Sequence, residues 1–178
     1  MENYSRVMVL LGSISDRTTA NIILSILREI DIPYRVVIAS CHWHTDNGLE
    51  ERVREIEEEI IAIVGGMQFN LPSIVETINK VNSKVYKIVL AIPTDRIAKH
   101  ANEDFPAGTV VFTGGFNSIS PKAGYENSAL AIAKLAAFRY PEFIPRLVEF
   151  YRKMAARKGM TKNMELENGL ISEPSKKS

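Results

Sequence analysis

Two short polar stretches in this 178-residue chain contain side chains that could do chemistry. The first is Gly12-Ser13-Ile14-Ser15-Asp16, which follows five apolar residues and precedes a helical pattern. Backbone N–H groups at a helix N-terminus and the positive end of the helix dipole favour an anion, most often a phosphate. The stretch therefore predicts a nucleotide-like or sugar-phosphate ligand, and the alternative is a plain turn with an N-cap. It lacks both the Walker A ending and the Gly-x-Gly-x-x-Gly pattern, so a dinucleotide is not favoured.

The second stretch is Ser40-Cys41-His42-Trp43-His44-Thr45-Asp46. Because the pKa of histidine lies near neutrality, a histidine beside hydroxyl groups suits proton transfer. The alternative is a histidine that anchors a loop through hydrogen bonds. A metal site needs three or four ligands, and the only histidine outside this stretch is His100, so we expect no metal. Cys41 is best explained as a small buried hydrophobic residue.

Both stretches follow apolar segments that predict buried strands. We expect strands at residues 7–11, 34–39, 60–64, 85–92 and 108–113. We expect helices at residues 17–31, 48–59, 71–79, 122–140 and 141–158, with a polar connection over residues 96–105. This alternation predicts an α/β fold: a three-layer αβα sandwich with a mainly parallel, flavodoxin-like five-stranded sheet and additional C-terminal helices.

Ligands of such sheets bind outside the carboxyl ends of the strands. Polar clusters lie at each of the expected strand ends, at residues 12–16, 40–46, 65–70, 93–95 and 114–121. The order of elements along the chain therefore predicts that these clusters converge on one site.

The composition is that of an ordinary globular protein, with 46% hydrophobic and 24% charged residues. The 22 basic and 21 acidic residues leave a net charge of +1, so neither nucleic acid nor a membrane surface is an expected partner. A single cysteine, a polar N-terminus and the lack of any apolar run near the roughly 20 residues of a membrane span favour a soluble cytoplasmic protein. We expect one α/β domain at residues 1–158 and a polar, flexible tail at residues 159–178.

With these motifs in hand, the chain resembles the phosphoribosylaminoimidazole carboxylase family, the PurE type. The first family loop, Gly-Ser-x-Ser-Asp, is matched in full by residues 12–16. The second, Ser-Ala-His-Arg-Thr-Pro-Asp, is matched at Ser40, His42 and Asp46. The third, Gly-Gly-Ala-Ala-His-Leu-Pro-Gly, shares a glycine and Leu-Pro with residues 66–73.

Two weaker matches extend the resemblance to about residues 6–155. Residues 91–95 echo the family's Gly-Val-Pro-Val-Gln, and residues 126–133 echo its late Ala-Asn-Ala-Ala-Leu-Leu-Ala-Ala helix. The sequence departs from the family at Trp43, which replaces an arginine that contacts phosphate, and at Asn70, which replaces a histidine. The bulky residues 67–69 are expected to narrow the pocket.

The resemblance implies an enzyme of purine biosynthesis that carboxylates carbon 4 of 5-aminoimidazole ribonucleotide. The carboxyl group would come from the N5-carbamate or from carbon dioxide, without a metal or organic cofactor. His42 would be the general acid/base, Ser13 and Ser15 would bind the 5′-phosphate, and Asp16 would bind the ribose hydroxyls. The remaining substrate-binding residues that the resemblance implies are Gly12, Ser40, Asp46, Gly66, Asn70 and Leu71.

Members of the family form octamers, so the resemblance also implies a homo-oligomer. Two alternatives to the carboxylase stay open. One is a paralogous enzyme that acts on another nucleotide or heterocycle, as in the related nickel-pincer cofactor carboxylases. The other is a catalytically silent ligand-binding homologue.

Overall fold

The computed structural model describes residues 4–41, 48–66, 69–82, 87–95, 109–111, 120–157, 166–167 and 170–171. Within these residues the main sheet consists of β1 (Val7–Leu11), β2 (Tyr34–Ile38), β3 (Ile60–Gly65), β4 (Ile88–Pro93) and β5 (Val110–Val111). The helices are α1 (Arg17–Glu29), α3 (Leu49–Arg54), α4 (Leu71–Asn82), α6 (Pro121–Arg139) and α7 (Ile144–Arg157), with short 3-10 turns η1 (Ile14–Asp16) and η5 (Pro141–Phe143).

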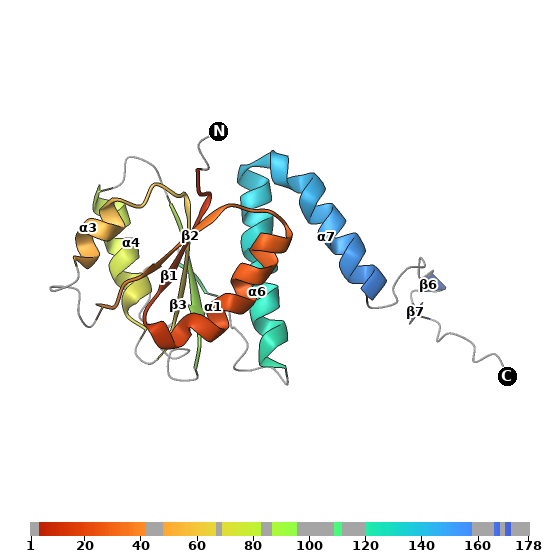
Figure 1. The fold of residues 1–178 in the computed structure, drawn as a ribbon, viewed down its shortest axis with the longest axis horizontal. Coiled ribbons are helices and arrows are strands. Elements are labelled where there is room, and N and C mark those ends of the chain that lie inside the picture. The colour runs from red at the N-terminus through yellow and green to blue at the C-terminus, as the bar shows by residue number, and fades with distance from the viewer. Residues whose placement is uncertain are drawn as a thin grey trace.

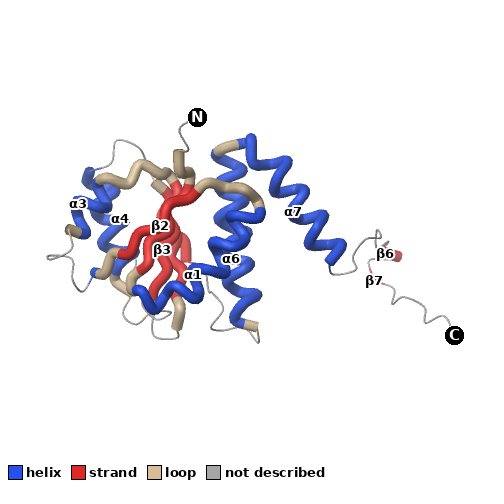
Figure 2. The backbone as a smooth tube through the Cα atoms, viewed as in Figure 1, coloured by secondary structure: helices blue, strands red, loops and turns tan. Residues whose placement is uncertain are grey.

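The strands of the main sheet lie in the order β2-β1-β3-β4-β5, and all four neighbouring pairs are parallel. This is the strand order of flavodoxin-like folds, so the predicted fold class is confirmed. In Figure 1, α3 and α4 lie on one side of the sheet and α1 and α6 on the other. Figure 2 shows the same three layers, with the strands between the helices. Because helices cover both faces, β1 and β3 are buried along their whole length.

Alternate residues of β1 point into two separate cores. Val7, Val9 and Leu11 belong to the core beneath α1 and α6. Met8 and Leu10 belong to the core beneath α3 and α4. The strand therefore holds the turn that follows it, residues 12–16, between the two helical layers.

The alanine-rich face of α6 packs inside the chain. Ala129, Ala133 and Ala136 are fully buried in the same core as Ala20 and Ile23 of α1. Small side chains let the two helices approach closely. This packing fixes α1, which directly follows the turn at residues 12–16, against α6.

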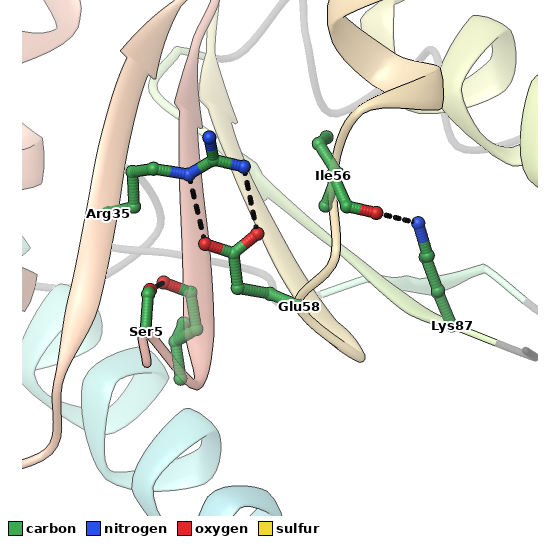
Figure 3. A network of polar contacts seen from close by, with 6 residues as sticks. Ser5, Arg35, Ile56, Glu58 and Lys87 are labelled. Atoms are coloured by element: carbon green, nitrogen blue, oxygen red, sulfur yellow. Dashed lines mark hydrogen bonds and ion pairs between the residues drawn. The ribbon is translucent and has the colours of Figure 1, made fainter. Parts of the chain in front are cut away.

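The helix predicted at residues 48–59 is shorter than expected, because α3 ends at Arg54. Ile56 and Glu58 are buried while Glu57 is exposed, an alternation that belongs to an extended segment rather than to a helix. Glu58 accepts hydrogen bonds from Arg35 Nε at 3.0 Å and Arg35 Nη2 at 3.1 Å. Lys87 donates to the carbonyl oxygen of Ile56. Figure 3 shows these contacts, which hold the segment between α3 and β3 in an extended conformation.

Helix α7 continues from η5 and extends away from the sheet in Figure 1. Its first half is anchored, since Leu147 and Phe150 are buried in the core beneath α1 and α6. Arg146 of α7 also contacts Asp31, just after α1, through a carboxylate oxygen at 2.9 Å and the carbonyl oxygen at 2.7 Å. Further along the chain, β6 (Leu166–Glu167) and β7 (Leu170–Ile171) pair antiparallel within the predicted tail. The flexibility of that tail stays a prediction.

The other predicted elements agree with the structure to within a few residues where they are described. The starts of the predicted fourth and fifth strands, the polar connection and most of the loop at residues 114–121 lie outside the described residues. Within the described part of the chain, no helix is long and apolar enough to cross a membrane.

Candidate active site

A cleft of about 730 Å³ opens at the carboxyl ends of the strands. These strand ends lie at the lower edge of the sheet in Figure 1. Residues that follow β1, β2, β3 and β4 meet there, as the sequence predicts. The residues that line it are Gly12, Ser13, Ile14, Ser15, Asp16, Thr19, Ile38, Ser40, Cys41, Gly65, Gly66, Phe69, Leu71, Thr94 and Asp95.

The structure thus brings together seven of the predicted site residues: Gly12, Ser13, Ser15, Asp16, Ser40, Gly66 and Leu71. Asn70 is exposed and is not among the residues that line the cleft, and its carbonyl oxygen accepts the first backbone hydrogen bond of α4 from Ile74 at 3.2 Å. His42 and Asp46 lie outside the described residues, as do Trp43 and His44.

The turn after β1 presents two hydroxyl groups to the solvent side of the cleft. Ser13 has extended backbone angles, and its hydroxyl oxygen accepts from the Ser15 N–H at 3.3 Å and from the Ser15 hydroxyl at 3.0 Å. Both serines are exposed. In this arrangement the proton of the Ser15 hydroxyl is used by Ser13, so the Ser13 hydroxyl can donate to an oxyanion directly and the Ser15 hydroxyl can do so once it rotates away from Ser13.

Asp16, in contrast, is only 7% exposed. Its Oδ1 atom accepts a hydrogen bond from the Thr94 hydroxyl at 3.2 Å, and the backbone of Ser13 also donates to the carboxylate. Burial raises the pKa of Asp16 above its ordinary value, against the effect of these two hydrogen bonds, and the charge of Asp95 acts in the same direction as burial. The carboxylate is thus held in a fixed position at an electrostatic cost.

Thr94 is itself fixed from two sides. Its backbone N–H donates to the carbonyl oxygen of Gly65 at 2.8 Å, and its carbonyl oxygen accepts from the Tyr125 hydroxyl of α6 at 3.4 Å. Burial raises the pKa of that hydroxyl, which also interacts with Thr19 of α1. The end of β4 therefore links α6 to the carboxylate of Asp16.

Two glycines at the end of β3 leave room for neighbouring side chains. A Cβ atom on Gly65 would lie 2.7 Å from the Phe69 ring, and a Cβ atom on Gly66 would lie 2.4 Å from Asp95 Oδ2 and 2.7 Å from Thr94 Oγ1. Phe69 has a φ of 44° and is 3% exposed. Such a conformation is unfavourable for a bulky side chain and persists where the surroundings enforce it. Phe69 belongs to the core beneath α3 and α4 and also lines the cleft, while Met67 and Gln68 lie outside the described residues, so the narrowing of the pocket stays a prediction.

The charges around the cleft are negative where they are described. Its lining contains the carboxylates of Asp16 and Asp95, and no lysine, arginine or histidine occurs among the described lining residues. Burial also raises the pKa of the Cys41 thiol, which favours the neutral form there. Across the part of the chain that the structure describes, no three histidine, cysteine or carboxylate side chains gather as metal ligands.

Thr19, Thr94 and Asp95 are lining residues to which the sequence analysis assigns no individual role. For Thr94 and Asp95, the sequence offers one indication of a role in the site, which is the position of residues 93–95 at the end of a predicted strand. The contact between Thr94 and Asp16 joins residues 78 positions apart, so no local pattern reveals it.

Comparison with known proteins identifies the family. The family described as AIR carboxylase matches residues 6–157. The N5-carboxyaminoimidazole ribonucleotide mutase of Methanocaldococcus jannaschii is 26% identical over 153 residues, which cover 83% of this chain and 89% of that protein. The protein of the same name from Thermotoga maritima is 26% identical over 171 residues, covering 91% and 92%.

Among solved structures, Treponema denticola PurE is similar with a TM-score of 0.62 and 21% identity, covering 86% of this chain and 93% of that one. This similarity supports the fold, and the family match extends over almost all of the described helices and strands. The chain belongs to the AIR carboxylase family.

Proposed function

We propose that this chain is a purine-biosynthesis enzyme that carboxylates carbon 4 of 5-aminoimidazole ribonucleotide. It would act as an N5-carboxyaminoimidazole ribonucleotide mutase or as an AIR carboxylase. The observation that carries the proposal is that the family's complete Gly-Ser-x-Ser-Asp motif forms one wall of the cleft at the strand ends. The names of the relatives from Methanocaldococcus jannaschii and Thermotoga maritima support the same reaction.

The proposed roles follow from the chemistry of each side chain. The exposed hydroxyls of Ser13 and Ser15 donate hydrogen bonds to the 5′-phosphate. Asp16, an acceptor held in place by Thr94, receives the ribose hydroxyls. Ser40 and Gly66 complete the described walls of the substrate site, together with Gly12 and Leu71. Asp46 and Asn70 are further proposed substrate contacts on the basis of the family resemblance alone.

His42 is the proposed general acid/base. In the mutase reaction the N5–carboxyl bond breaks, carbon dioxide leaves and N5 takes up a proton. Carbon 4 then forms a bond to the same carbon dioxide and loses its own proton. One histidine can remove the proton from carbon 4 and supply the proton at N5, provided that carbon dioxide stays beside the ring. The carboxylase reaction uses the second half of this sequence, with carbon dioxide from solution, where the dehydration of bicarbonate supplies it.

We also propose that the enzyme works in the cytoplasm as a homo-oligomer, and an octamer is the expected size. The alanine face of α6 is used within the chain and is not available for assembly. The apolar side chains that support association lie instead at the end of α6 and along α7, where Phe138 is 87% exposed, Ile144 48% and Val148 41%. Light scattering on the eluting protein during size-exclusion chromatography measures the assembly size directly.

The test of the reaction is turnover of 5-aminoimidazole ribonucleotide and of its N5-carbamate by the purified full chain. The His42→Asn variant should lose turnover while its circular dichroism and melting temperature stay those of the wild type. His100→Asn removes a histidine with no proposed role and serves as the matched control, which should keep its activity. If the wild-type chain neither turns over nor binds these ribonucleotides, the proposed reaction is wrong.

A second candidate is a related enzyme that acts on another nucleotide or heterocycle. The observation that favours it is the absence of a basic side chain among the described lining residues, together with the extra carboxylate of Asp95. Thermal unfolding in the presence of a panel of nucleotides distinguishes the two, since a ligand at 100 times its Kd stabilises the fold by about 2.7 kcal/mol. Stabilisation by another nucleotide but not by the aminoimidazole ribonucleotides would favour this second function, and no stabilisation by any would favour a silent homologue.

A further inference from the structure

Thr94 and Asp95 follow β4 and lie in the cleft, but the proposed function uses Thr94 only to hold Asp16 and gives Asp95 no role. The family motif that residues 91–95 echo has valine and glutamine at these two positions, so this chain carries a hydroxyl and a carboxylate in place of a methyl and an amide. These replacements change the hydrogen-bonding capacity of the wall formed by β4.

The hydroxyl of Thr94 and the backbone of Ser13 together fix the orientation of the Asp16 carboxylate. The Thr94 hydroxyl donates to Asp16 Oδ1 at 3.2 Å, and the backbone of Thr94 is itself held by Gly65 and Tyr125 at 2.8 Å and 3.4 Å. A donor on a fixed backbone restricts the rotation of the acceptor side chain. Valine at this position would have a similar shape but no donor.

The carboxylate of Asp95 lies on the same side of the cleft. A Cβ atom built on Gly66 would touch both Asp95 Oδ2, at 2.4 Å, and Thr94 Oγ1, at 2.7 Å, so these two groups crowd the same point at the end of β3. The negative charge of Asp95 also contributes to the raised pKa of Asp16, as expected when two carboxylates share one end of a cleft. Ionised carboxylates only accept hydrogen bonds.

This end of the cleft therefore favours a ligand group that donates two hydrogen bonds. The two carboxylates would repel an anionic group. The hydroxyls of Ser13 and Ser15, on the turn after β1, can instead donate to an anion. A ribose phosphate meets both demands when its phosphate lies at the serines and its two ring hydroxyls face the carboxylates. A 2′-deoxyribose offers one donor where the site presents two carboxylates.

We propose that Asp95 is a specificity-determining residue that, together with Asp16, binds the 2′,3′-diol of the substrate ribose and selects ribonucleotides over 2′-deoxyribonucleotides. Thr94 is the positioning residue that aims Asp16 at this diol. The inference deepens the proposed function and rests on it.

The experiment measures the Kd of 5-aminoimidazole ribonucleotide and of its 2′-deoxy analogue by isothermal titration calorimetry. The proteins are the wild-type full chain, Asp95→Asn, Thr94→Val and Thr94→Ser, each checked by thermal unfolding. Glu142→Gln removes a carboxylate from the exposed η5 turn, far from the strand ends, and is the matched control for the change in charge.

The wild type should bind the ribonucleotide roughly 10-fold or more tightly than the deoxy analogue, because a site built to pair a hydroxyl discriminates against its absence. Asp95→Asn should lose most of this preference, chiefly through weaker binding of the ribonucleotide. Thr94→Val should reduce the preference and Thr94→Ser, which keeps the hydroxyl, should restore it. Glu142→Gln should behave as the wild type.

Equal preference in the wild type and Asp95→Asn would overturn the role of Asp95, as would a wild type that binds both nucleotides equally. In either case the proposed reaction would still stand. If the wild type binds neither nucleotide, the proposed function fails and this inference fails with it. Should Asp95→Asn not fold, the comparison of Thr94→Val with Thr94→Ser still decides whether the end of β4 selects the diol.

Discussion

The buried carboxylate of Asp16 should make the folded chain less stable at neutral pH than it would be without that charge. Burial raises the pKa of Asp16 despite the hydrogen bonds from Thr94 and Ser13, and the facing charge of Asp95 adds to the effect. Below the ordinary aspartate pKa, both the folded and the unfolded chain carry the proton, so Asp16 contributes nothing. As the pH rises, the unfolded chain ionises first, and the stability lost reaches its full value above the raised pKa.

The Asp16→Asn variant tests this directly. It removes the charge while keeping a carbonyl oxygen that can accept from Thr94. Because the variant removes a buried charge and can keep the hydrogen bond from Thr94, we expect a gain in unfolding free energy at neutral pH on the order of 1 kcal/mol, the usual size of the effect of a single substitution. For a chain of this length such a gain raises the Tm by about 2–4 °C. Binding sites commonly retain groups that lower the stability of the fold, because those groups are needed for function.

The assay is calorimetric or fluorescence-detected unfolding from roughly pH 3 to pH 7.5, over which the two proteins should converge at the acidic end. Glu59→Gln is the control with the opposite sign. Arg139 lowers the pKa of Glu59 through a hydrogen bond, so that variant should be less stable than the wild type at neutral pH and should approach it on acidification. If Asp16→Asn is less stable than the wild type at neutral pH, the hydrogen bonds outweigh burial and the reasoning is refuted.

Two further predictions concern the ends of β3 and the segment before it. Gly66→Ala should lower the unfolding free energy by about 1–3 kcal/mol, because the new Cβ would lie 2.4 Å from Asp95 Oδ2 and 2.7 Å from Thr94 Oγ1 and must displace both groups. It should also weaken ribonucleotide binding for the same reason, and unchanged binding by calorimetry would contradict this. Arg35→Met should lower the unfolding free energy in urea by about 1–3 kcal/mol, because it leaves the buried Glu58 without its bidentate partner. Glu58→Gln should lower the unfolding free energy less than Arg35→Met does, since it leaves only a half-exposed arginine without its partner. If Glu58→Gln is instead the more destabilising of the two variants, the burial of Glu58 is not the cause of the effect.

Local patterns were sufficient to predict the sheet and the first wall of the site. β1 and β3 are continuous apolar runs, and the turn at residues 12–16 combines small and polar side chains within five positions, so both are readable from neighbouring residues. The convergence of the strand ends followed from the order of strands and helices, because parallel strands place their carboxyl ends at one edge.

Contacts between distant residues could not be predicted in this way. The segment at residues 55–59 was interpreted as helix because its apolar residues also fit helical spacing. Its actual conformation depends on Arg35 and Lys87, which lie 23 positions before Glu58 and 31 positions after Ile56. The pairing of Thr94 with Asp16 likewise depends on the register between β3 and β4, in which Gly65 lies opposite Pro93. The sequence predicts a polar strand end at residues 93–95, but it does not predict that Thr94 contacts Asp16.

β2 is an edge strand of the sheet, which has a consequence for the aggregation of the protein. A terminal strand presents backbone groups that can pair with a strand from another molecule and so begin aggregation. Val36 and Ile38 are 38% and 43% exposed, which adds an apolar surface to that edge. Charged neighbours oppose such pairing, and β2 carries Arg35 between its apolar residues, held by Glu58. Loss of this ion pair should therefore lower the refolding yield at high protein concentration, in addition to its effect on the stability of the folded chain.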